Sequence, residues 1–315
     1  MMAETTSQWG AAVRGLGVML SEFRSQSEQA YTPSWEPIVK VRKGNAAAEN
    51  VSGKTGIGVL EQFAEGSSIP RANRYKLYTT VFNQKQYGKQ IEVTRQQLLY
   101  RDFQNAFDEA RDLSQSAKIL KSKAPGQIFN NAFTAGNANV NGVWVVTYAD
   151  GVALASTVHP RVDGGTAQSN ASSTGITLTE ANFETARVAM QDQLYDDGTP
   201  IVITGKIHIV VPIALEKTAL IIVGSGLRPG TGNNDVNIYN DGTYGVVSSK
   251  WLGAAQSGSD TRWFVVSDSA SRLIMIVGAD LDFDQSVEKN TKSTLFDAAL
   301  DLVVGSEDWR GFWAT

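Results

Sequence analysis

The chain has 315 residues, of which 42% are hydrophobic and 19% are charged, and its formal net charge at pH 7 is −4. This balance is typical of globular proteins and excludes an intrinsically disordered chain. The absence of cysteine excludes disulfides, a thiol nucleophile and a thiolate metal site. No apolar run approaches the roughly 18 residues of a membrane-spanning helix, and the N-terminus lacks the features of a secretory signal. We therefore expect a protein that works in the cytoplasm where it is made, with no membrane partner.

The charge is unevenly distributed along the chain. Residues 1–125 hold 17 of the 28 Lys and Arg residues but only 12 of the 32 Asp and Glu residues, so the remainder is acidic. Two explanations of this asymmetry stand equally: chance combined with solvated surfaces, and a second hypothesis about assembly. In that hypothesis, basic arms of one subunit rest on the acidic bodies of the next. Neither part is basic enough for a sequence-reading nucleic-acid binder.

The first 55 residues are predicted to form an N-terminal arm. Trp9, Val13, Leu16, Leu20 and Phe23 follow a helical spacing, although nearby glycines weaken an isolated helix. Prolines then end this pattern, and the polar stretch 43–55 indicates an extended tether. Such a weak helix needs a surface on which to dock.

Residues 56–94 are predicted to form an extended β-hairpin. The outgoing strand begins at residues 56–60, residues 66–74 form the tip, and residues 78–94 return. The strand-prone segment from Tyr75 mixes apolar residues with Lys, Gln and Asn, so neither of its faces is continuously apolar. Because such a strand gains little from packing on its own domain, we expect it to lie on a neighbouring subunit.

A long helix is predicted to follow. Thr94 and Gln97 have the spacing of a capping box. A narrow apolar stripe then runs through Leu99, Phe103, Ala106, Ala110, Leu113, Ala117, Leu120 and Ala124. A coiled coil is the alternative, but the many alanines favour close packing on a sheet. Pro125 and Gly126 should kink or interrupt this spine before residues 127–133 resume it.

The rest of the chain has an ordinary α/β pattern. A strand is expected within residues 137–150, a surface loop at 161–175, and a helix capped by Thr179. A buried strand at 207–211 precedes a helix from Pro212 to about Val223. Strands at 244–247, 263–266 and 273–277 should complete one small mixed sheet. Two last strands, 295–304 and 309–313, are expected to return to the spine helix.

Catalytic and metal-binding signals are weak, and no cofactor is expected. His159 and His208 lack the spacing of metal ligands and are interpreted as structural. The glycine-rich segment 224–230 lacks the ending of a phosphate loop and indicates a flexible connection. Asp280, Asp282 and Asp284 alternate, but Gln285 stands where a calcium loop needs glycine, so a solvated strand face or an acidic contact is favoured. Two histidines offer little for a Ser-His-Asp triad.

Tryptophans occur near both ends of the chain, where domain cores are rare. Trp9 and Trp35 lie in the arm, and Trp309 and Trp313 near the C-terminus. Each is interpreted either as a core residue or as an interface anchor.

The order of these parts resembles the major capsid protein family of tailed bacteriophages, which has the Hong Kong 97 fold. Several local phrases are also similar to that family. They are YGKQIEVTRQQLLYRD (87–102), IFNNAFTA (128–135), DGVALASTVHP (150–160), HIVVPIALEKTALIIVGSG (208–226), NNDVNIY (233–239) and DWRGFW (308–313). The likeness covers most of the chain from about Gly56, and its specificity lies in the order and spacing of the phrases.

The resemblance implies an α+β capsid fold with five parts. Residues 1–55 would be the N-terminal arm and 56–94 the extended loop, which lies over an adjacent subunit. Residues 95–165 and 280–315 would form the peripheral domain with its spine helix and return strands, and 166–279 the α/β axial domain. Such subunits form hexamers and pentamers that close into an icosahedral head around double-stranded DNA.

A set of candidate subunit-contact residues follows from the arm, the tryptophans, the hairpin and the acidic strand. They are Trp9, Phe23, Trp35, Arg71, Arg74, Tyr75, Lys76, Tyr78, Lys85, Tyr87, Lys89, Asp280, Asp282, Asp284, Trp309 and Trp313. No catalytic residue is proposed.

The expected partners are other copies of the chain, a portal, a decoration protein and packaged double-stranded DNA in non-specific contact. Because the arm begins within a dozen residues of Met1, we expect a separate scaffolding protein, or none, and no maturation cleavage. Non-covalent shells are expected, located in the virion after assembly in the host bacterial cytoplasm. Two alternatives stay open: an encapsulin-type compartment of the same fold, and a carboxylate-dependent hydrolase.

Overall fold

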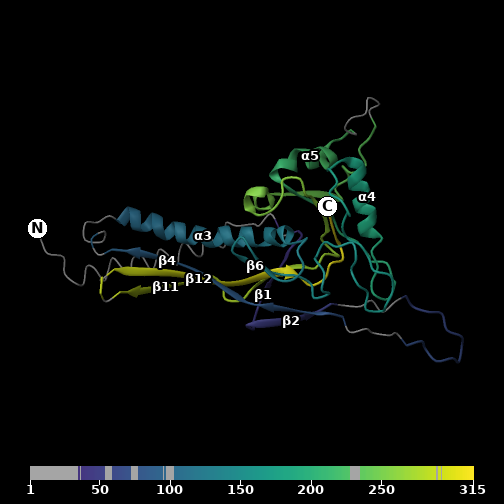
Figure 1. Ribbon diagram of the computed structural model, residues 1–315, viewed down its shortest axis with the longest axis horizontal. Helices are drawn as coiled ribbons and strands as arrows, with labels where there is room; N and C mark the ends of the chain where they lie inside the picture. The colour runs from purple at the N-terminus through teal and green to yellow at the C-terminus, as the bar shows by residue number, and fades with distance from the viewer. Residues whose placement is uncertain are drawn as a thin grey trace, which may run out of the picture.

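A long helix lying along a long, twisted sheet dominates the computed structural model, and a second, smaller sheet with its own helices stands at one end (Figure 1). The structure describes residues 35, 37–53, 59–71, 77–94, 96, 103–227, 235–288, 290–291 and 293–315. Three sequence predictions therefore fall outside the described residues. They are the helical stripe from Trp9 to Phe23, the outgoing strand at 56–58, and the capping partner Gln97.

The long sheet has seven strands and is organised around β12, its longest strand. Its main path runs β1-β10-β12-β6-β5, while β4 and β11 both pair with the other part of β12. Their bounds are β1 Lys40–Lys43, β4 Lys85–Val93, β5 Ala138–Val140, β6 Val143–Val146, β10 Leu273–Val277, β11 Asp282–Val287 and β12 Thr294–Ser306. In β12 the residues from Thr294 to Leu302 alternate between buried and more exposed positions, as expected of a strand with one covered face.

The predicted hairpin is wrong in its pairing. The return segment forms β4, which pairs antiparallel with β12 of the same chain from Val93 opposite Thr294 to Lys85 opposite Leu302. It does not project as a strand toward a neighbour. The apolar side chains that seemed too sparse, Tyr87, Ile91 and Val93, lie on the face shared with buried Phe296 and Leu300, where they join the core. One apolar face is enough to hold a strand in an antiparallel sheet when its other face is solvated.

A separate two-stranded sheet stands where the outgoing strand was expected to pair. It joins β2 (Ala48–Ser52) to β3 (Thr79–Asn83) in antiparallel register. The stretch 43–55, expected as an extended tether, thus contains a paired strand, while the described residues 59–71 contain none. Phe82 of β3 is fully buried and anchors this small sheet against the long one.

The spine helix α3 (Phe103–Asn130) runs through Pro125 without interruption, so the predicted break at Pro125 and Gly126 is absent. Two tryptophans cover the helix at this point. The Trp35 indole donates to the Ser122 carbonyl at 2.9 Å, and the Trp251 indole donates to the Ser122 hydroxyl at 3.0 Å. A Cβ on Gly126 would stand 2.9 Å from the Trp251 Cβ, so the glycine permits this close approach. The packing and hydrogen bonds of these two indoles hold the helix despite the hydrogen bond that proline removes.

The smaller sheet has four strands in the order β13-β9-β7-β8. Helices α4 and α5 pack on it (Figure 1). The bounds are α4 Glu180–Gln191, β7 Ile207–Pro212, α5 Ile213–Gly224, β8 Tyr244–Ser249, β9 Phe264–Ser267 and β13 Phe312–Ala314, with short 3-10 turns at Lys250–Leu252 and Ala254–Gln256. Thr179 caps α4 as predicted, because its hydroxyl accepts a hydrogen bond from the Asn182 amide.

Two strands lie in a different sheet from the one predicted. Residues 273–277, expected in the small mixed sheet, form β10 of the long sheet between β1 and β12. The last strand, expected to return to the spine, is β13 and pairs with β9 of the small sheet. Both faces of β10 are buried, so its apolar sequence would fit the middle of either sheet. Only its pairing partners, β1 and β12, determine which sheet it joins.

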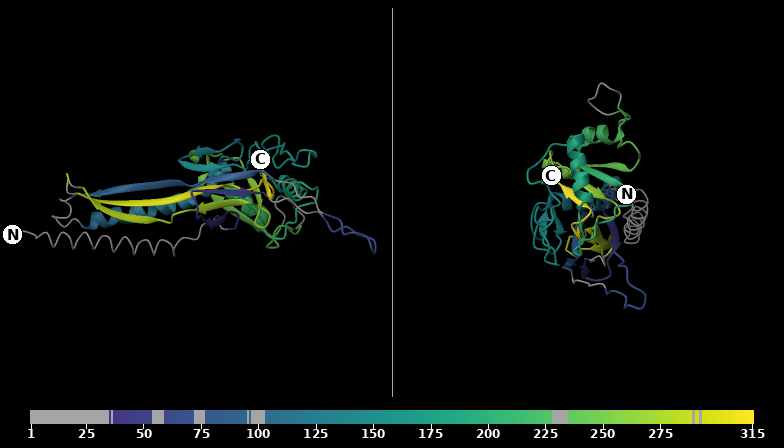
Figure 2. Two further views of the ribbon diagram at one scale, coloured as in Figure 1. Left: turned by 90° about the horizontal axis from the view of Figure 1, so that it is seen from below. Right: turned by 90° about the vertical axis from the view of Figure 1, so that its right-hand side faces the viewer.

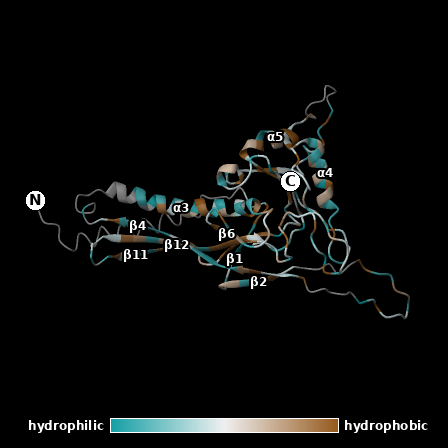
Figure 3. Cartoon of the chain, viewed as in Figure 1, coloured by the Kyte–Doolittle hydropathy of each residue, from teal (hydrophilic) through white to brown (hydrophobic). Residues whose placement is uncertain are grey.

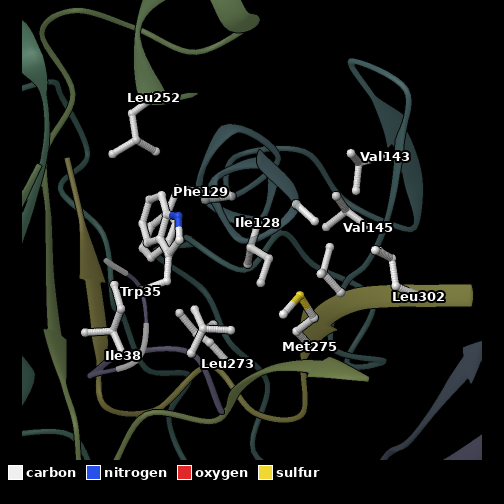
Figure 4. Packing of buried hydrophobic residues seen from close by; sticks show 14 of the residues in the cluster. Trp35, Ile38, Ile128, Phe129, Val143, Val145, Leu252, Leu273, Met275 and Leu302 are labelled. Carbon is white, nitrogen blue, oxygen red and sulfur yellow. The ribbon is translucent and has the colours of Figure 1, made fainter. Parts of the chain in front are cut away.

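The main core spans both sheets. It places Trp35 and Phe129 in stacked contact, 5.5 Å between ring centroids, beside Leu273 and Met275 of the long sheet (Figure 4). Phe264 of the small sheet also belongs to this cluster. A second cluster around Phe183, Met190 and Trp263 fills the space between the small sheet and its helices. The shared core explains why the two sheets form one body.

Candidate functional site

The loop 59–71 is the most exposed apolar segment that the structure describes. It leaves the body at the end where α3 finishes and projects away from both sheets (Figures 1 and 2). Val59, Leu60, Phe63 and Ile69 are 78%, 97%, 51% and 72% exposed. A turn closed by the Ser67 amide and hydroxyl on the Ala64 carbonyl shapes its tip. Apolar side chains gathered on a projecting loop are typical of a surface that a partner covers.

The charge of this loop differs from the expected basic arm. Its described residues carry Glu61 and Glu65 against Arg71, which is exposed. The hypothesis of a basic arm on an acidic body therefore finds no support in this segment. Of the other arm candidates, Trp9, Phe23, Arg74, Tyr75 and Lys76 lie outside the described residues.

The tryptophans that were candidate anchors belong to the subunit's own core. Trp35 is 1% exposed and stacks on Phe129. Trp309 is buried against the His159 ring, with centroids 4.3 Å apart, and Trp313 packs on Trp263. Of the two interpretations of these three residues, the core interpretation holds, because a side chain buried inside its own subunit has no surface left for a neighbour.

Tyr78, just before β3, and the candidates on β4 are divided between the core and the surface. Tyr78 packs edge-on against Tyr148. Tyr87 is half-buried, and its hydroxyl accepts a hydrogen bond from the Trp144 amide at 2.9 Å. Burial raises the pKa of this phenol, although the bond from Trp144 opposes the shift. Lys85 lies over the Trp144 ring at 4.9 Å, and Lys89 is exposed.

The outer face of the long sheet is acidic. Alternation places Asp282 and Asp284 of β11 on one face. Asp297 lies opposite Asp284, and the register adds Asp301 of β12 and Glu92 of β4. The strand positions of β4, β11 and β12 on this face hold no Lys or Arg. Asp280 does not share it as predicted, because it precedes β11 and its carboxylate pairs with Lys121 of α3 at 2.9 Å.

An apolar surface also covers α5 and the segments that follow it. Ile213, Leu220 and Ile221 of α5 are exposed, and Val236 and Ile238 extend the surface beyond the helix. Figure 3 shows the hydrophobic colouring along α5. The glycine-rich segment 224–230 was predicted as a flexible connection, but its residues 228–230 lie outside the described part. Leu227, within the segment, pairs with Val236.

A buried ion network at the C-terminus was missed from the sequence. The Arg310 guanidinium donates to Asp196 at 2.9 Å, to both Asp308 oxygens at 3.1 and 3.2 Å, and to the Leu194 carbonyl at 2.7 Å. Burial disfavours the charge of Arg310, but the carboxylates of Asp308 and Asp196 outweigh it and hold the pKa above its ordinary value. The DWRGFW phrase (308–313) was the only sequence signal for this network, and nothing in it indicates that Asp196 is the partner of Arg310.

Both histidines are buried, as a structural role requires. The His159 ring nitrogens face Asp150 at 2.7 Å and Asn170 at 3.0 Å. Asn170 in turn donates to the carbonyls of Leu154 and Trp309, which ties the 150–172 region to the C-terminus. His208 packs closely on Gly245, and burial lowers its pKa. The described residues contain no cluster of His, Asp and Glu suited to a metal ion.

The described surface carries several hollows. The first, of about 620 Å³, is lined by charged groups that include Lys40, Arg42, Arg272 and Glu307. Arg42 and Glu307 form an ion pair across it. The second, of about 410 Å³, lies between α3 and the long sheet and is mostly lined by small or apolar residues. The third, of about 630 Å³, lies along α5 and is lined by Glu216, Lys217, Leu220, Ile221, Gly224 and Ser225. Among the described helices, none has the length and hydrophobicity to span a bilayer.

Comparison with known proteins gives one family and several similar folds. A family model described as phage capsid protein matches residues 77–315. The chain is similar in structure to the capsid of Ralstonia phage GP4, with 14% identity, a TM-score of 0.55, and coverage of 88% of this chain and 86% of that one. The bacteriophage JBD30 capsid has 13% identity and a TM-score of 0.54, with coverage of 71% of this chain and 92% of that one. The capsid of Myoviridae phage XM1 has 12% identity and a TM-score of 0.52, with coverage of 88% of each chain. No curated protein matches the chain.

Proposed function

The chain belongs to the phage capsid protein family, and we propose that it is the major capsid protein, whose copies assemble through hexamers and pentamers into an icosahedral head around double-stranded DNA. Its fold is of the Hong Kong 97 type, and its role is structural, as part of the capsid shell. The proposal adds the arrangement of the subunits, the enclosed DNA and the absence of a catalytic function.

The observation that carries this proposal is the exposed apolar loop 59–71. Its four large apolar residues lie in water in the isolated subunit. Full burial of a side chain of this kind contributes roughly 1.5–3 kcal/mol. A loop that covers an adjacent subunit would recover this free energy once per subunit, and many such contacts add up in a closed shell.

The division into parts stays a proposal of the same kind. We assign residues 1–55 to the arm, 56–94 to the extended loop, 95–165 and 280–315 to the peripheral domain, and 166–279 to the axial domain. Two strands are exceptions to these bounds, because β10, within 166–279, lies in the long sheet and β13, within 280–315, lies in the small sheet.

The proposed partners are other copies of the chain, a scaffolding protein, a portal and a decoration protein, with assembly in the host bacterial cytoplasm. Contacts with packaged DNA are proposed to be non-specific. The acidic outer face, with Asp282, Asp284, Asp297, Asp301 and Glu92, would repel phosphates. DNA contact is therefore expected elsewhere on the subunit.

Electron microscopy of the purified protein, with light scattering for mass, tests this function. Closed shells, tubes or rings are expected. A homogeneous species near 34.0 kDa at high concentration, even with scaffolding protein supplied, would contradict the proposal and favour the hydrolase alternative. The nucleic acid content of purified particles distinguishes a phage head from an encapsulin-type compartment, which packages a protein cargo.

Deletion of residues 66–74 tests the role of the loop. The subunit should stay folded, because the described residues of this segment are exposed, while shell formation weakens. Val202→Ser, at another exposed apolar position, is the control. Unchanged assembly of the deletion variant would count against the loop's assigned role.

A further inference from the structure

The His159 ring is enclosed by groups that accept hydrogen bonds. Its side chain and that of Asp150 are almost wholly buried, with 0% and 1% exposed. Nδ1 lies 2.7 Å from the Asp150 carboxylate, and Nε2 lies 3.0 Å from the Asn170 side-chain oxygen. An ionised carboxylate only accepts, so the protonation of the ring depends on which end of the Asn170 amide faces it.

Backbone groups fix the orientation of the Asn170 amide. Its nitrogen donates to the carbonyls of Leu154 and Trp309 at 2.7 and 3.3 Å, and its oxygen accepts from the Ser156 amide at 2.8 Å. Reversal of the side-chain amide would bring its oxygen against two carbonyls and its nitrogen against an N–H, so all three bonds would be lost. The oxygen therefore faces His159, and Nε2 must donate to it.

The second ring nitrogen needs a proton as well. If Nδ1 were bare, its lone pair would point at a carboxylate oxygen 2.7 Å away, and burial would make that repulsion costly. The other Asp150 oxygen accepts from the Val152 amide at 3.2 Å, as an ionised carboxylate does. Because imidazole is a stronger base than a carboxylate, the proton between the two groups belongs to the ring. The hydrogen bonds thus define a buried imidazolium.

The neighbouring aromatic and charged groups suit a cation at this position. The Trp309 ring stacks on His159 with centroids 4.3 Å apart, and the Arg310 guanidinium lies 4.6 Å from the same indole. The face of an indole attracts cations, and two carboxylates already neutralise Arg310. Burial raises the pKa of Tyr148 and keeps that phenol uncharged. The charged groups that these segments bring to the junction are Asp150, Arg161, Asp163, Asp196, Asp308 and Arg310.

This pair lies where the segment 150–172 joins the rest of the subunit. The Ala314 amide of β13 donates to the Asn170 carbonyl at 2.9 Å. The Ala155 amide donates to the Ala132 carbonyl, just beyond the end of α3, at 2.7 Å. The side chain that orients His159 therefore belongs to a residue that also bonds the last strand of the small sheet.

We propose that His159 is a buried imidazolium whose Nδ1 proton holds the segment 150–172 on β13. Without that proton, Nδ1 and the Asp150 carboxylate would be two acceptors facing each other in the interior, so the attachment weakens as the pH rises and the proton is lost. Since both ring nitrogens donate, neither is free to act as a general base. All these groups belong to one subunit, so the inference goes beyond the proposed function and does not depend on assembly.

Nitrogen NMR of protein carrying isotope-labelled histidine tests the protonation, because the chain has only two histidines. The His208→Gln variant leaves the His159 signals alone and so assigns them. At about pH 8, where an ordinary imidazole is neutral, His159 should give two signals of the protonated type. His208, whose pKa burial lowers, should give one protonated and one bare nitrogen, and it is the internal control. A bare-nitrogen signal from His159 at this pH would overturn the proposal.

Asp150→Asn tests the counterion. The ring should become neutral, with one bare nitrogen, because an amide nitrogen can donate to Nδ1 and no longer stabilises the charge. Asp241→Asn, at an exposed carboxylate, is the control and should leave both protonated signals. Two protonated nitrogens in the Asp150→Asn variant would contradict the assigned pairing.

A pH titration of the unmodified protein tests the attachment and needs no variant. As the pH rises, the bare-nitrogen signal of His159 should appear together with a several-fold rise in hydrogen–deuterium exchange of β13. The exchange is measured relative to β7 at the same pH, because hydroxide accelerates exchange in every segment. If the signal appears while this ratio stays constant, the proton does not hold the strand and the proposal is wrong.

Discussion

The C-terminal segment 307–315 and the loop 59–71 both mix charged and large apolar residues, but every residue of the first is buried and every residue of the second is exposed. In the C-terminal segment each charge meets a partner, as Arg310 meets Asp196 and Asp308. In the loop the apolar side chains meet water. Composition alone therefore does not distinguish a segment that stabilises the subunit from one that is proposed to bind a neighbour; contacts within the subunit do.

The largest expected effect comes from the C-terminal ion network. Arg310→Ala leaves Asp196 and Asp308 buried without their cation, and loss of one partner of a buried ion pair costs about 3–5 kcal/mol. Urea unfolding of the subunit measures this change in the free energy of unfolding. Arg71→Ala, in the exposed loop, is the matched control and should change it by less than about 0.5 kcal/mol. Similar losses for both variants would refute the contrast between the two segments.

Two glycines with similar backbone angles give the next comparison. Gly311 has φ 72° and a built Cβ would stand 2.6 Å from the Ala270 carbonyl carbon, whereas Gly66 has φ 79° and nothing within 4 Å. Gly311→Ala is expected to cost about 1–3 kcal/mol or more, since strain and contact combine. Gly66→Ala should leave global unfolding nearly unchanged, because the loop relaxes in solvent. Thermal denaturation of both variants measures this difference, and equal melting temperatures would contradict the predicted contrast between Gly311 and Gly66.

His208 extends the comparison to pH. Its burial lowers its pKa below the ordinary value of 6.5, so the unfolded chain binds the proton more readily than the folded one. The stability that depends on a neutral His208 is therefore present above pH 6.5 and is lost as the pH falls below it. The slope due to this one group is at most about 1.4 kcal/mol per pH unit. His208→Gln should flatten the dependence measured by unfolding at pH 5 to 7; an unchanged slope would exclude this residue as its source.

The smallest effect on the subunit is expected in the loop. Leu60→Ser removes an apolar side chain that is 97% exposed, so the free energy of unfolding should change by less than about 0.5 kcal/mol. Assembly, followed by light scattering, should weaken because the proposed contact loses apolar area. Val202→Ser serves as the control at an exposed site outside the loop. A destabilised subunit, or assembly as strong as in the control, would show that the two segments do not divide their roles as proposed.

Much of the fold followed from local pattern. The stripe through Leu113, Ala117 and Ala124 is the buried side of α3, as its helical spacing predicted. The Thr179 cap and the buried strand β7 also occur where expected. These features depend on neighbours in the sequence, and so a periodicity or a cap reveals them. The family resemblance depended likewise on the order of short phrases, and the family match over residues 77–315 confirms it.

Sites in the interior were harder to predict. The pairing of Arg310 with Asp196 joins residues 114 positions apart, and neither residue differs in sequence from an ordinary solvated charge. The hollow between α3 and the long sheet likewise depends on elements far apart in the sequence, since Gly88 of β4, Ala117 of α3 and Ala298 of β12 line it. Such features arise from the relative position of elements and leave no periodic signal.

The sequence by itself determined the existence of the long helix, most strands, the helix cap and the capsid family, because these follow from propensity, spacing and phrase order. Only the tertiary structure decided the partners. β4 pairs with β12 rather than projecting, β10 and β13 exchange their expected sheets, and Trp35 enters the core instead of an interface. The physical reason is that a strand's edge hydrogen-bonds equally well with many partners. Its choice depends on register and burial summed over distant segments.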